Sequence, residues 1–143
     1  MHGWRPLDMP GRWPVAPLTD PDRLAELIDF VATPRFRRRG TLFVVFCDKD
    51  GYVIHPVALT SLDDGPDADD ERLLDACAEM LAEHFPSDSL AVGIARAQPP
   101  DWTDEDRAWA RLAEQACRHH GIRFVGAAVV TDDGRAAAGI PRM

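Results

Sequence analysis

The stretch that decides the fold is IARAQPPDWTDED, residues 94–106. An apolar run typical of a buried strand, Ser89 to Ala95, leads into it, and a helix pattern follows it. Thr103 is a residue type that caps helices, and Asp106 stands three positions later, at the second place of a capping box. Because α/β domains place their chemistry where a strand gives way to a helix, we expect the functional loop here.

Strand and helix patterns alternate on both sides of this loop. The first helix is expected to begin at Asp20 and to end at Thr33-Pro34. A second helix follows the acidic loop 63–71, and a third runs from Thr103 to Gly121. The expected apolar faces are Leu73, Leu74, Cys77, Met80 and Leu81 in the second helix, and Ala108, Trp109, Leu112, Ala116 and Cys117 in the third.

Strands are predicted at 41–47, 52–59, 89–95 and 122–131, with a short last strand after residue 134. The order of elements predicts a three-layer α/β/α sandwich on a mixed sheet of about five to six strands. The chain of 143 residues has room for one such domain, which we assign to residues 19–143. Residues 1–18 contain four prolines and two tryptophans, which predicts an extended arm lying on this domain or on another chain.

Composition narrows the class of protein. No apolar run approaches the roughly 20 residues of a membrane helix, and the first residues lack a secretory signal pattern, so we expect a cytoplasmic protein. The net charge of −8 argues against nucleic-acid binding, which depends on neutralising phosphates. One basic cluster, Arg35, Arg37, Arg38 and Arg39, either contacts a phosphate or acidic partner or is a solvated loop. The three widely spaced cysteines are expected to be buried free thiols.

From residue 40 to 138 the order of elements resembles the RadC-like branch of the JAB family, also called JAMM or MPN. In that family a strand ends in His-x-His-Pro, and a Ser-x-x-Asp opens the next helix; both histidines and the aspartate bind zinc. Here Arg96-Ala97-Gln98-Pro99 falls on the first segment and Thr103-Asp104-Glu105-Asp106 on the second. The resemblance implies a JAB/MPN-like sandwich, similar in shape to cytidine deaminases.

The departures from the family pattern imply that the chemistry has been lost. Arg96 is a fixed cation that a metal repels, and Gln98 is a weak neutral ligand. No glutamate on the early strands could serve as the family's general base, and the deaminase motifs His-x-Glu and Pro-Cys-x-x-Cys are also absent. We therefore expect no catalytic residues, no metal and no cofactor, and we interpret Asp106 as part of a helix cap.

The adjacent histidines His119 and His120 are a second metal candidate. Neighbouring positions on a helix point about 100° apart, so we do not expect this pair to clamp one ion. A location at the helix C-terminus, where imidazole is favoured by the helix dipole, is the preferred interpretation.

These patterns predict a non-catalytic JAB/MPN-like domain that acts as a protein-interaction or scaffold module. The expected binding surface is the former active-site loop, with Arg96, Gln98, Trp102 and Asp106. Trp102 could instead pack the loop onto the helix. The partner is an unidentified protein bound along the loop or at an edge strand, with a homodimer as an alternative. The alternatives are a hydrolase with a non-standard site, using Asp101, Glu105, Asp106 and His55, and a nucleic-acid-associated accessory protein using Arg35 to Arg39.

Overall fold

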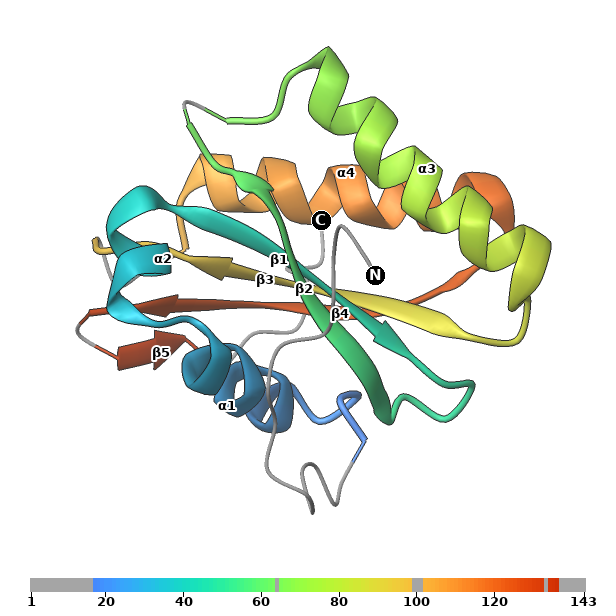
Figure 1. Ribbon diagram of the computed structural model, residues 1–143, viewed down its shortest axis with the longest axis horizontal. Helices are drawn as coiled ribbons and strands as arrows, with labels where there is room; N and C mark the ends of the chain where they lie inside the picture. Colours follow the sequence, from blue (N-terminus) through green and yellow to red (C-terminus); the bar gives the residue numbers. More distant parts are fainter. Residues whose placement is uncertain (1–16, 64, 99–101, 133, 137–143) are drawn as a thin grey trace, which may run out of the picture.

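The computed structural model describes residues 17–63, 65–98, 102–132 and 134–136 (Figure 1). Residues 1–16 of the predicted arm, which include both of its tryptophans, lie outside these ranges. Its last residue, Leu18, is already part of the domain, because its side chain is buried and its backbone N–H donates to Gly51 O at 2.8 Å. The elements are α1 (Pro21–Val31), α2 (Pro34–Arg39), β1 (Thr41–Cys47), β2 (Val53–Ser61), α3 (Ala68–His84), β3 (Ser89–Ala95), α4 (Asp104–His120), β4 (Arg123–Thr131) and β5 (Gly134–Ala136).

The strands form one open mixed sheet in the order β2-β1-β3-β4-β5. β1 runs antiparallel to both β2 and β3, and β3 runs parallel to β4, with α4 as the crossover between them. Four strands of seven to nine residues make up the body of the sheet, and β5 adds three residues at one edge. The predicted α/β class and the mixed pairing are confirmed.

Both faces of the sheet are covered, as the unbroken apolar runs of β1 and β3 predict. Leu42 and Val44 of β1 pack with α3 and α4, whereas Phe43 and Val45, which point the other way, pack with α1. Figure 1 shows α3 and α4 together on one side of the sheet and α1 on the opposite side. Among the described residues, no helix combines the length and the apolar character that a membrane crossing requires.

One helix was absent from the sequence prediction. Thr33-Pro34 was expected to end the first helix and leave a loop, but Pro34 opens the six-residue α2, which carries the arginine cluster. The N–H group at the first position of a helix has no acceptor within the helix, so proline, which lacks this group, is well suited to start α2 three residues after α1 ends.

The apolar faces of the two long helices also differ from the prediction. Leu73 and Met80 of α3 are exposed, and in α4 Ala108 and Leu112 are only partly buried. Their places in the core are taken by Ala78, Ala110 and Ala113. Alanine lets helix backbones approach closely, so the contact face is rotated toward the small side chains and away from some large ones.

The close packing of α1 on the sheet leads to a first prediction, at Gly93 in β3. A Cβ atom at this position would lie 2.3 Å from Cδ1 and Cγ1 of Ile28 in α1. Gly93→Ala is therefore expected to lower the free energy of unfolding by about 1–3 kcal/mol, measured by urea denaturation. In an Ile28→Ala background, which removes the clashing atoms, the same change should cost much less. Equal costs in both backgrounds would contradict the close approach.

Candidate functional site

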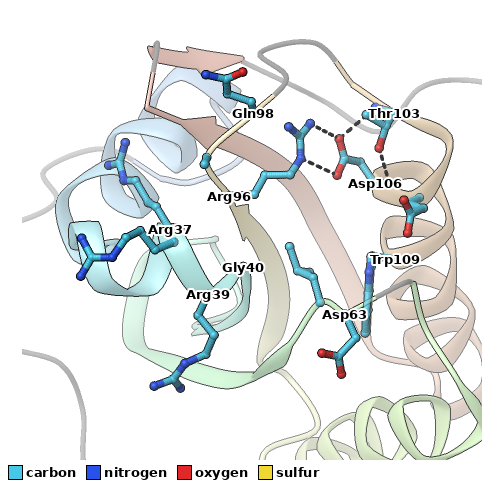
Figure 2. A pocket seen from close by; sticks show the side chains of 13 residues that line it. Arg37, Arg39, Gly40, Asp63, Arg96, Gln98, Thr103, Asp106 and Trp109 are labelled. Carbon is cyan, nitrogen blue, oxygen red and sulfur yellow. Dashed lines mark hydrogen bonds and ion pairs between the residues drawn. The ribbon is translucent and has the colours of Figure 1, made fainter.

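The candidate site is a cavity of about 320 Å³ at the carboxyl end of β3. It lies between α2, the segment after β2 and the first turns of α4, which agrees with the position expected from the strand-to-helix junction (Figure 2). The residues lining it are Arg37, Arg38, Arg39, Gly40, Leu62, Asp63, Arg96, Ala97, Gln98, Thr103, Glu105, Asp106 and Trp109.

An ion pair between Arg96 and Asp106 occupies the inner wall of this cavity (Figure 2). Arg96 Nε donates to Asp106 Oδ1 at 3.1 Å, and Arg96 Nη2 donates to Oδ2 at 2.5 Å. The Asp106 side chain is 3 % exposed and that of Arg96 is 12 % exposed. Two parallel bonds between a guanidinium and a carboxylate form the most directional ion pair available to proteins.

Asp106 also holds the start of α4. Its Oδ2 accepts from the Thr103 backbone N–H at 2.9 Å, and its own N–H donates to Thr103 Oγ1 at 3.1 Å. This confirms the capping box that was predicted from the sequence. The Asp106 carboxylate thus accepts three hydrogen bonds, two from Arg96 and one from Thr103, and these contacts fix its position and orientation.

The other two residues of the predicted binding surface lie apart from this pair. Gln98 is exposed at the rim of the cavity (Figure 2). Trp102 is partly buried and packs against the core on the α3 and α4 side of the sheet. Trp102 therefore packs onto the domain, as the second interpretation of this residue expected, and it is not among the residues that line the cavity.

The four arginines of the basic cluster have different surroundings. Arg37 is 13 % exposed and points back into the domain, where it donates to the backbone oxygens of Ala32, Asp29 and Thr131 and pairs with the Asp29 carboxylate. Arg38 and Arg39 are exposed and line the cavity, whereas Arg35 is exposed and does not line it. The cluster is therefore partly structural and partly available for contacts.

Two acidic residues face these arginines across the cavity. Asp63 follows β2, and Glu105 lies in the first turn of α4; both are exposed. Asp63 was not singled out from the sequence, although it belongs to the acidic loop, and its φ of 46° is a conformation that aspartate tolerates better than most residues. The cavity therefore has a mixed charge and is not a uniformly basic surface.

Of the residues of the alternative hydrolase site, Glu105 and Asp106 line the cavity, whereas His55 lies elsewhere. His55 pairs with Phe46 at one end of β1, whereas the cavity lies next to Thr41 at the other end, about 16 Å away along the strand. Asp101 lies outside the described residues. The separation removes His55 as a base for Asp106 or Glu105.

The cysteines do not supply a nucleophile to the cavity. All three cysteines are free thiols, as predicted, and Cys47 and Cys117 are buried, whereas Cys77, which was also expected to be buried, is only partly buried. Burial raises the pKa of Cys47 and Cys117 to about 12 and that of Cys77 to about 11, so the reactive thiolate is scarce at neutral pH.

Comparisons with protein-family models, with curated proteins and with solved structures found no match for this chain.

Proposed function

We propose that this chain is a non-catalytic JAB/MPN-like domain that binds a segment of a protein partner in the cavity at the carboxyl end of β3. The observation that carries the proposal is the buried ion pair between Arg96 and Asp106. In the JAB pattern, the positions that these two residues occupy belong to zinc ligands. Here the guanidinium supplies the positive charge that a metal would otherwise bring to the carboxylate.

The hydrogen bonds of the pair argue against a hydrolytic role. A general base must be able to reach a water or substrate proton, but both oxygens of the Asp106 carboxylate are engaged with Arg96 or Thr103. A metal at the same carboxylate would have to displace a guanidinium bound at two points. The pair of Arg96 and Asp106 is therefore better suited to form a rigid, charge-neutral part of a binding surface than to catalyse hydrolysis.

The rim of the cavity indicates what kind of partner fits. Arg38 and Arg39 offer exposed positive charge, and Asp63 and Glu105 offer exposed negative charge on the facing side. A volume of about 320 Å³ accepts one or two side chains of a polypeptide segment, and a segment with both acidic and basic groups would complement the rim. Nucleic acid is a weaker fit because the rim is mixed and the chain carries a net charge of −8.

The cavity is a better location for the partner than the exposed edge of the sheet at β2. Pro56 lies within β2 and has no N–H group to donate, and the pairing of β2 with β1 is interrupted by two register shifts. Proline and irregular pairing are features by which proteins prevent a further strand from adding to an edge.

A matched pair of glutamines tests the proposed binding surface. Gln98 at the rim and Gln115 on α4 are both exposed, but only Gln98 lines the cavity. With a photoreactive amino acid at position 98, cross-linking in the host cell is expected to give one discrete adduct with a second protein. The adduct should disappear when Arg38 and Arg39 are both changed to glutamate, and the same amino acid at position 115 should give none.

Two results would contradict the proposal. Adducts of equal yield from positions 98 and 115 would show that the cavity has no special role in partner contacts. Hydrolytic turnover by the purified protein that is lost in a folded Glu105→Gln variant would show that the cavity is an active site. An adduct of twice the chain mass would identify a second copy of this chain as the partner.

A further inference from the structure

A second group of residues that can carry chemistry lies on the far side of the domain core from α1, where α3 packs beside α4. It consists of Asp75 on α3 and of His119 and His120, the last two residues of α4. None of the three lines the cavity described above. Their side chains are 40 %, 73 % and 18 % exposed, so the group is open to solvent on one side.

The two histidines converge on one carboxylate. His120 Nε2 lies 3.0 Å from Asp75 Oδ1, and His119 Nδ1 lies 3.9 Å from the same oxygen. The two imidazole rings are stacked, with centroids 4.7 Å apart and an interplanar angle of 11°. The three ligand atoms all lie within 4.8 Å of one another. Although adjacent helical positions point about 100° apart, both rings therefore lie beside the same carboxylate of α3.

We propose that Asp75, His119 and His120 form a binding site for a divalent first-row transition-metal ion of the Zn²⁺ class. Two imidazole nitrogens and one carboxylate oxygen are a ligand set that such ions prefer over the hard cations Mg²⁺ and Ca²⁺. Three protein ligands leave a fourth position for water or for a group from a partner. The site would join α3 to α4 through one ion.

The geometry requires only a small rearrangement to take an ion. Bonds of about 2.0–2.2 Å in a tetrahedral site place ligand atoms about 3.3 Å apart. The separations from Asp75 Oδ1, 3.0 and 3.9 Å, lie on either side of that value, and the three atoms together lie within 4.8 Å, so a ligand must move inward. The nitrogen lone pairs of stacked rings lie in two separate parallel planes, and one ion cannot lie in both, so one ring must turn. His119 can do so, because its side chain is largely in solvent.

The position of the group at the end of a helix favours a cation. The last carbonyl groups of α4 carry the partial negative charge of the helix dipole, and α4 ends at Gly121 in a left-handed conformation just after the two histidines. A hydrogen bond between His120 and Asp75 alone would join the helices, but it would not place His119 Nδ1 toward the same oxygen.

The test is calorimetric titration of untagged, chelator-treated protein with Zn²⁺ and, separately, with Co²⁺, whose visible absorption reports a tetrahedral site. We expect one saturable equivalent of each ion and a rise in the unfolding temperature on binding. His119→Ala removes a ligand that is mostly in solvent, so the fold should be kept and binding should weaken by at least about tenfold. Asp75→Asn and His120→Ala should do the same.

His84→Ala is the matched control, because His84 is an exposed histidine at the end of α3 outside the group, and it should bind as the wild type does. Circular dichroism of each apo variant separates loss of a ligand from loss of fold. Absence of saturable binding by the wild type, or equal affinity of the wild type and the folded His119→Ala variant, would overturn the proposal. With Mg²⁺ no binding is expected, and binding of Mg²⁺ as tight as Zn²⁺ would contradict the ligand chemistry.

Discussion

Replacing Asp106 with alanine is expected to lower the free energy of unfolding by about 3–5 kcal/mol, the largest single effect that this structure predicts. The change removes a carboxylate that is 3 % exposed and accepts two bonds from the largely buried Arg96. It also removes one half of the capping box with Thr103, which contributes about 1 kcal/mol within the same total. Urea denaturation followed by circular dichroism measures the difference.

Asp104 provides a matched control in the same turn of α4. Its side chain is fully exposed and pairs with Arg107 on the helix surface. Asp104→Ala should therefore cost no more than about 1 kcal/mol, the upper range for an exposed pair together with its interaction with the helix dipole. Similar costs for Asp104→Ala and Asp106→Ala would show that the buried pair is not the source of the effect.

A double-mutant cycle isolates the pair itself. Arg96→Met together with Asp106→Ala removes both charges, and replacing a buried ion pair by apolar groups usually costs less than removing one partner. We expect the double variant to be more stable than the sum of the two single changes predicts, by about 1–3 kcal/mol. Additive costs would mean that Arg96 and Asp106 do not interact in the folded protein.

The same variants bear on function. If Asp106 only holds the wall of a binding surface, Asp106→Ala should change stability, and any loss of partner cross-linking should follow the loss of folded protein. Loss of a hydrolytic activity in a fully folded variant would favour the alternative of a hydrolase with a non-standard site. We therefore expect Asp106→Ala to act mainly through the stability of the fold and not through a catalytic step.

The local part of this site could be predicted from the sequence, because it depends on short spacings. Thr103 and Asp106 are three residues apart at the start of an apolar helical pattern, and the capping box follows from that spacing alone. The strand Ser89–Ala95 was likewise predicted with its observed bounds, because its apolar run is unbroken and ends at a charged residue.

The partners that come from distant segments could not be predicted. Arg96 bonds to Asp106 across a loop that contains two prolines, and no spacing rule relates the two. Asp75 meets His120 from 45 residues away, because of how α3 and α4 pack. Their approach depends on alanines such as Ala78 and Ala113, which a search for large apolar residues passes over. Sequence patterns identify which residues can act, but tertiary packing decides which of them meet.

Replacing Arg37 with alanine is expected to lower the free energy of unfolding by about 2–4 kcal/mol, the second-largest effect. Its guanidinium donates to three backbone oxygens, those of Asp29 and Ala32 around the end of α1 and that of Thr131 at the end of β4, and it pairs with the Asp29 carboxylate. Bonds from a charged donor are worth more than neutral ones, and four of them here hold α1, α2 and β4 together.

Arg38 and Arg39 are the matched controls, since they are neighbours of the same residue type with exposed side chains. Alanine at either position should change stability by less than about 0.5 kcal/mol, while the Arg38→Glu and Arg39→Glu pair should abolish partner cross-linking at position 98. If Arg37→Ala were as stable as the wild type, Arg37 would not be a structural residue and would belong with Arg38 and Arg39 to the contact surface.

The same variants test the nucleic-acid alternative. A strong, salt-dependent affinity for DNA that is lost in the folded Arg38 and Arg39 variants would support that alternative over a protein partner.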